Sequence, residues 1–157
     1  MITAQKDESA KKFQDFVYNY FRQEWKWNLI HNTSYENQYK EGENHQGIEI
    51  KHDQKFESGS PNVYISVKRT YPYQDDMPSG IMKEHNRLFY VIGGINKFYI
   101  FPLNKLRRYF LDESPRLLKG FTTPKGGTEY GFLLSTKKSE DMAIDIYEKI
   151  EQQVLPI

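Results

Sequence analysis

The stretch GENHQGIEIKHDQKFESGSPNVYISVK, residues 42–68, carries the pattern from which the rest of the chain can be interpreted. Its first part alternates apolar and polar side chains, which is the period of a strand with one buried face. Ile48 and Ile50 are therefore expected to enter a core. The opposite face of the same strand then carries Glu49, Lys51 and Asp53.

A second alternating run spans residues 62–69. The segment between the two runs, residues 54–61, contains Ser-Gly-Ser-Pro and is predicted to be a loop that returns the chain antiparallel to the first strand. Paired strands of this kind would place carboxylates beside a lysine on one face of a sheet. Val63, Ile65 and Val67 are expected on the apolar face of the second strand, and Tyr64, Ser66 and Lys68 on its polar face.

Composition indicates one domain, residues 1–157, that is long enough to bury a core. The net charge is +1, yet residues 62–125 hold eleven Lys or Arg and five Asp or Glu, a local excess of +6. Such an excess favours an anionic partner, and a solvated basic face is the alternative. The absence of cysteine excludes disulfides, thiol catalysis and Cys-ligated zinc.

The N-terminal residues MITAQKDES are polar and lack the apolar region of a signal peptide. No run approaches the about 18 apolar residues of a membrane span. A soluble, cytoplasmic protein is the expectation.

The remaining periodicities predict how helices and strands alternate. A helix over 8–25, with Phe13, Phe16, Val17, Tyr20 and Phe21 on one apolar stripe, should come first. The strand pair, a hairpin with a glycine break at 93–94, a second helix, an edge strand and a closing helix should follow. This order predicts an α/β sandwich in which helices flank a mixed central sheet. The expected hairpin joins 87–93 to 97–101, the second helix spans 103–111, the edge strand spans 130–134, the closing helix begins at 139 and reaches 154, and 71–79 and 114–125 are loops.

Hydrolysis of a phosphodiester with a metal ion requires carboxylates that hold Mg²⁺ and a cation that steadies the attacking water or the developing charge. Glu49 on the first strand and Lys68 on the second offer this combination, with Ser66 two residues before the lysine. Further acids that are candidates for the same cluster are Glu36, Glu43 and Asp53.

These residues resemble the PD-(D/E)XK nuclease superfamily, in particular its phage and restriction-type branch, in which a Gln-rich loop runs into a Gly-Ile-acid strand. The similarity covers roughly residues 33–134. It is carried by Glu36, Gln38, GEN at 42–44, GIEIKHD at 47–53, VYISVK at 63–68, PSGI at 78–81, the later segment LNKLRRYF and the strand YGFLL.

The resemblance implies a restriction-endonuclease-like fold and a Mg²⁺- or Mn²⁺-dependent site. Glu49 matches the first metal-binding acid and Lys68 the lysine, whereas Ser66 stands where the second acid belongs. A hydroxyl supplies neither the charge nor the ligand strength of a carboxylate. Glu43 and Asp53 are the candidate substitutes, although Asp53 lies about 13 Å from Glu49 along an extended strand.

A different register uses Glu49-Ile50-Lys51 as the acid-X-lysine triplet, with Glu36 or Glu43 as its partner acid. A third interpretation gives Glu49 and Lys51 no chemistry, as the solvated face of a half-exposed strand.

The functional expectation is a metal-dependent endonuclease that hydrolyses DNA, with a homodimer as one arrangement open to it. The alternatives are a degenerate protein that binds nucleic acid or a protein partner without cleavage, and an interaction subunit with an aromatic surface. The residues expected to contact nucleic acid are Lys51, Arg69, Lys105, Arg107 and Arg108.

Overall fold

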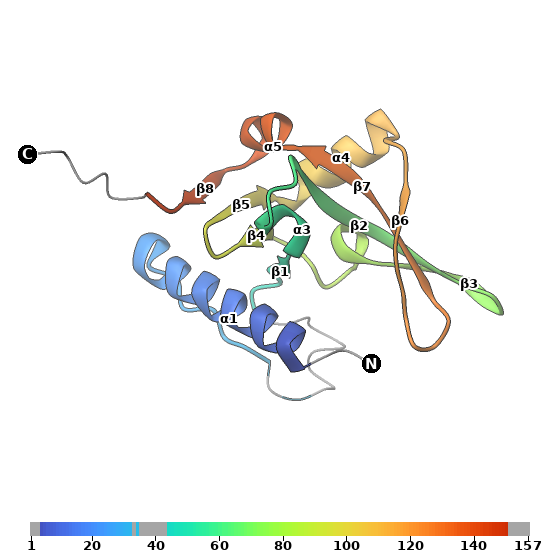
Figure 1. Ribbon diagram of the computed structural model, residues 1–157, viewed down its shortest axis with the longest axis horizontal. Helices are drawn as coiled ribbons and strands as arrows, with labels where there is room; N and C mark the ends of the chain where they lie inside the picture. The colour runs from blue at the N-terminus through green and yellow to red at the C-terminus, as the bar shows by residue number, and fades with distance from the viewer. Residues whose placement is uncertain (1–3, 33, 35–43, 151–157) are drawn as a thin grey trace, which may run out of the picture.

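Two four-stranded sheets form the body of the protein, as the computed structural model shows for residues 4–32, 34 and 44–150 (Figure 1). The first sheet has the order β1-β4-β5-β8 and the second the order β3-β2-β7-β6. The strands of the first are β1 (Glu49–His52), β4 (Phe89–Gly94), β5 (Lys97–Pro102) and β8 (Asp145–Glu148). Those of the second are β2 (Asn62–Tyr71), β3 (Gln74–Pro78), β6 (Leu118–Thr122) and β7 (Thr128–Ser135).

In these described segments, five of the six strand pairs are antiparallel, and only β1 and β4 run parallel. A parallel pair needs a long crossover, and here the chain makes α3 and the whole β2-β3 hairpin before it returns as β4. This crossover places β1 and β2 in different sheets. The expected antiparallel pairing of these two strands is therefore wrong, because β1 pairs with β4 and both edges of β2 are taken by β3 and β7.

The helices occupy the outer faces and the connections. They are α1 (Ala4–Tyr20), a π-helical turn (Phe21–Trp25), α3 (Gln54–Glu57), the 3-10 turn η2 (Gly80–Met82), α4 (Leu103–Glu113) and α5 (Thr136–Met142). None of the helices in the described part of the chain is long and apolar enough to cross a membrane.

The first sheet separates two hydrophobic clusters. On its outer side α1 buries Phe13 and Val17, and the π-helical turn buries Phe21, against residues of the sheet. The stripe predicted for this helix is thus confirmed, and so is the burial of Ile48 and Ile50. The sheet contributes Ile50, Val91, Phe98 and Ile100 to this outer cluster, and Ile48, directly before β1, joins them.

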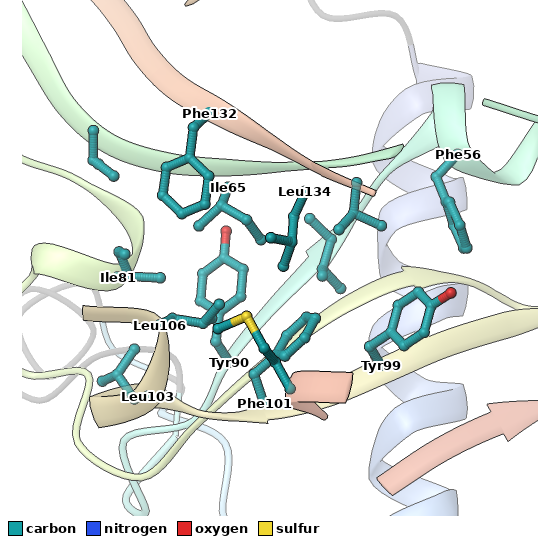
Figure 2. Close-up of a cluster of buried hydrophobic side chains, with 14 residues drawn as sticks. Phe56, Ile65, Ile81, Tyr90, Tyr99, Phe101, Leu103, Leu106, Phe132 and Leu134 are labelled. Atoms are coloured by element: carbon teal, nitrogen blue, oxygen red, sulfur yellow. The ribbon is translucent and has the colours of Figure 1, made fainter. Parts of the chain in front are cut away.

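The second cluster fills the space between the two sheets (Figure 2). Ile65 and Phe132 are cross-strand neighbours in the second sheet, and both pack toward Tyr90 and Phe101 of the first. Leu106 of α4 closes the cluster from one end. The α/β class and the flanking helices follow from this packing, while the single central sheet of the prediction is replaced by two sheets.

Several local predictions hold. The hairpin of β4 and β5 turns at Gly94 to Lys97, and α4 begins at Leu103 as expected. The loops at 71–79 and 114–125 instead contain β3 and β6, and 54–61 contains α3. β7, expected as an edge strand, lies between β2 and β6.

The closing helix predicted over 139–154 is the local prediction that differs most from the structure. Helix α5 ends at Met142, and residues 145–148 form an edge strand against β5. Tyr147 stacks on Phe98 with ring centroids 5.2 Å apart. The helical spacing of apolar residues was misleading here, because the open edge of β5 offers hydrogen bonds that local periodicity does not reveal. The predicted end of this helix, 151–154, lies outside the described residues.

Candidate functional site

A cavity of about 720 Å³ lies between β1 and α3 on one side and the second sheet on the other. Residues 50–53, at the end of β1 and the start of α3, line its first side, and Tyr64 and Ser66 of β2 line its second. Polar side chains from the two segments therefore meet across a cavity, although β1 and β2 do not pair. Other residues that line it include Lys55, Tyr90, Leu118, Lys119, Phe121, Glu129 and Leu133.

Glu49 is a buried carboxylate, with 1% of its surface exposed. Its Oε1 lies 3.0 Å from Lys51 Nζ and 4.0 Å from Lys83 Nζ. Burial raises the pKa of Glu49, but the two ammonium groups and a hydrogen bond from Asn86 outweigh burial, so its pKa lies below the usual value. The contact with Lys51 is an ion pair and not a well-aligned hydrogen bond, because Oε1 has no donor of good geometry among the described residues.

Arg107 holds the turn that brings Lys83 and Asn86 to Glu49. Its Nε donates to the carbonyl of Ile81 at 2.6 Å, and its Nη2 donates to the carbonyls of Lys83 and Asn86, both at 2.9 Å. The planar guanidinium thus serves three backbone acceptors at once. Arg107, expected to contact nucleic acid, has a structural role in this arrangement.

Lys68 lies away from this cluster. The pairing of β2 with β7 shifts between Ser66 and Lys68, so Val67 forms a bulge. Ser66 pairs with Gly131 and Arg69 with Glu129, which share one face, whereas Lys68 pairs with Tyr130 on the other face. The expectation that Ser66 and Lys68 share a face is therefore wrong.

The contacts of Lys68 agree with this placement. Its Nζ lies 3.6 Å from Asp76 Oδ2 and 6.0 Å from the centroid of the Tyr130 ring. Glu49 is paired instead with Lys51, which is the lysine of the alternative acid-X-lysine register.

The Asp53 carboxylate accepts hydrogen bonds from two backbone N–H groups. Its Oδ1 accepts a hydrogen bond from the N–H of Phe56 at 3.0 Å and caps α3, and its Oδ2 accepts one from the N–H of Tyr64 at 2.9 Å. The carboxylate thereby ties the start of α3 to β2. This role differs from the metal binding expected for Asp53.

Tyr64, Ser66 and Tyr90 bring hydroxyl groups to the cavity wall. Ser66 Oγ lies beside the Tyr90 hydroxyl without the geometry of a hydrogen bond, and neither Ser66 Oγ nor the Tyr64 hydroxyl has a hydrogen-bond partner among the described residues. Burial raises the pKa of Tyr90, and burial with the charge of Glu129 raises the pKa of Tyr64. Both phenols stay neutral at physiological pH.

The other predicted residues are dispersed. Arg69 pairs with Glu129, with Nε and Oε2 3.5 Å apart, and lies over the Phe121 ring. Lys105 and Arg108 are exposed on α4. Glu36 and Glu43 lie outside the described residues.

The described residues do not fit the expected Mg²⁺ or Mn²⁺. These ions take oxygen ligands, with one or two carboxylates from the protein. Glu49 is already neutralised by two ammonium groups, and the described part of the chain has no group of three Asp, Glu, His or Cys residues placed to hold an ion.

Sequence reasoning missed Lys83, Asn86, Tyr90 and Glu129. Glu129 accepts a hydrogen bond from the Ser79 hydroxyl at 3.2 Å. The available signal was an acid directly before the apolar run 130–134. Comparisons with protein-family models, curated proteins and solved structures find no match to this chain.

Proposed function

We propose that this protein binds DNA at the cavity between β1 and the second sheet, without metal-dependent cleavage by the Glu49 cluster. The observation that carries the proposal is the lining, in which Lys51, Lys55 and Lys119 accompany Tyr64 and Phe121. Lysines attract phosphates, and aromatic rings offer stacking surfaces for bases.

The acids of the lining support the same assignment. Asp53 is occupied by two backbone N–H groups, and Glu129 is held by Arg69 and Ser79. Both carboxylates therefore already have donors, which reduces their repulsion of a phosphate. The lysines of the cavity rim therefore give it a net positive charge.

Fluorescence anisotropy with labelled single- and double-stranded DNA between 50 and 200 mM salt tests the proposal. Affinity should fall as salt rises, with a log–log slope of about −1.4 for two phosphate contacts on a single strand, those of Lys55 and Lys119. Replacing Lys55 and Lys119 together by Ala should weaken binding about tenfold and flatten the slope. The control is Lys137→Ala, exposed on α5. A DNA affinity that does not depend on salt, or that is the same in the double variant, contradicts the proposal.

A metal-dependent DNA nuclease is the second candidate function. It is supported by the ion pair of Glu49 with Lys51, two residues apart on one face of β1, which is the arrangement of an acid-X-lysine triplet. Its partner acid would be Glu36 or Glu43.

Nicking of supercoiled plasmid in Mg²⁺ or Mn²⁺ decides between the two functions. The second function requires cleavage by the natural chain and its loss in both Glu49→Gln and Lys51→Ala, with folding verified by circular dichroism. DNA binding without nicking under any divalent ion supports the first function.

A further inference from the structure

We infer that the cavity is a pocket for one unpaired nucleotide, whose base meets Tyr64 and Ser66 and whose phosphate meets the lysine rim. This inference rests on the proposed DNA binding and names the part of the nucleic acid that enters. Its volume of about 720 Å³ lies within the range of small-molecule sites.

Two hydroxyl groups give the pocket its polar specificity. Ser66 is only 2% exposed and lines the cavity, yet its Oγ has no hydrogen-bond partner in the described part of the protein. The Tyr64 hydroxyl is in the same situation. Buried hydroxyls normally find a partner, because each can donate and accept. The polar edge of a nucleobase presents both donors and acceptors and would satisfy the two groups together.

The ring of Tyr64 lies on a surface that glycine keeps flat. A Cβ on Gly120 would lie 2.5 Å from the Tyr64 hydroxyl oxygen, and a Cβ on Gly131 would lie 2.7 Å from Tyr64 Cζ. The two glycines of β6 and β7 thus let the phenol lie close to the strand backbones. A ring held in this way keeps its hydroxyl at one place on the cavity wall, where the edge of a base can meet it.

The rim supplies the anion site. Lys55, on α3, lines one side and Lys119, on β6, lines the other, while Lys51 on β1 is paired with Glu49. A phosphate attached to a base inside the cavity would meet ammonium groups from both walls. Apolar contacts to the sugar are available from Ile92, Leu118 and Leu133.

Isothermal titration with the four deoxynucleoside 5′-monophosphates, the matching nucleosides and inorganic phosphate tests the inference. At least one monophosphate should bind more tightly than its nucleoside and than phosphate alone. It should also compete with single-stranded DNA in anisotropy. If phosphate binds as well as every monophosphate, the site is a plain anion site and the inference is overturned.

Tyr64→Phe and Ser66→Ala separate ligand recognition from folding. Each removes a hydroxyl that has no hydrogen-bond partner among the described residues, so thermal stability should stay the same or rise. Each should weaken monophosphate binding about tenfold, the value of one hydrogen bond. Ser58→Ala, on the surface, is the matched control. Unchanged monophosphate affinity in both variants overturns the pocket.

The two proposals fail in different ways. If the protein binds DNA but no monophosphate, the nucleotide pocket is contradicted and the proposed DNA binding is retained. If the protein does not bind DNA, the proposed function is contradicted. Monophosphate binding that both hydroxyl variants weaken would then identify the pocket as a site for free nucleotides.

Discussion

Lys68 lies on the opposite face of the second sheet from Ser66, although the two residues are separated by a single position in β2. The bulge at Val67 causes this reversal, since it adds one residue to β2 opposite β7 and changes the side to which later residues point. Val67 is itself buried in the core between the sheets. The lysine of the expected catalytic motif is therefore turned toward Tyr130 and Asp76.

A carboxylate introduced at position 66 should not create a cleavage site that depends on Lys68. Ser66→Glu should give no cleavage that Lys68→Ala abolishes. It should also destabilise the fold by at least about 2 kcal/mol at pH 7, because an ionised carboxylate would be buried on the face of the sheet that also carries Glu129. Urea unfolding and plasmid nicking measure the two effects, with the exposed Ser58→Glu as control. Cleavage that requires both the introduced carboxylate and Lys68 would show that the two side chains do meet.

Glu49 should make stability depend on acid pH. Its folded pKa lies below the ordinary value of 4.5, so its contribution is complete above that value and is lost as the pH falls through the folded pKa. Glu49→Gln should remove this part of the acid dependence, whereas the exposed Glu84→Gln should keep it. Denaturant unfolding from pH 7 to pH 2.5 measures the difference. A pH profile identical in Glu49→Gln and the natural chain would contradict the ion pairs described for this carboxylate.

Arg107 should be far more important for stability than its neighbour Arg108. Arg107→Lys keeps the charge but loses the fork that serves three carbonyls, and we expect a loss of about 2 kcal/mol. Arg108→Lys, at an exposed position of the same helix, should change stability by less than about 0.5 kcal/mol. Thermal and urea unfolding provide the comparison. Equal effects of the two variants would count against the structural role of Arg107.

Asp53 should contribute to folding independently of metal. Asp53→Ala removes the α3 cap and the link to the N–H of Tyr64, with an expected loss of about 1–3 kcal/mol. Asp53→Asn keeps one carbonyl oxygen and should lose less. Both losses should be the same in EDTA and in millimolar Mg²⁺, and Asp75→Ala, at an exposed position, should be neutral. If Mg²⁺ stabilised the natural chain and Asp53→Asn removed this effect, Asp53 would be a metal ligand.

Gly80 should tolerate no side chain. Its φ is +51°, and a Cβ would lie 2.1 Å from Ser66 Oγ and 2.2 Å from the carbonyl oxygen of Ser66. Gly59 also has a positive φ, +111°, but no atom lies within 4 Å of its Cβ position. Gly59→Ala should therefore show backbone strain alone, about 1–2 kcal/mol, and Gly80→Ala distinctly more. Similar losses in the two variants would mean that Gly80 does not pack closely on Ser66.

Elements with local signals could be predicted from the order of residues alone. The apolar stripe of α1, the alternation that buries Ile48 and Ile50, and the glycine break between β4 and β5 each depend on neighbours along the chain. Side-chain period and turn chemistry are properties of such short segments. The same reasoning correctly selected Glu49 and Lys51 as residues on one face of a strand.

The pairing of strands and the contacts between side chains depend on segments that are far apart in the sequence. The partner of β1 is β4, about forty residues later, and the edge of β5 converts an apparently helical segment into β8. A single bulged residue turns Lys68 away, while a turn held by Arg107 brings Lys83 to Glu49. These outcomes depend on competition among distant hydrogen-bonding edges and buried charges, which have no signature in the spacing of residues along one chain.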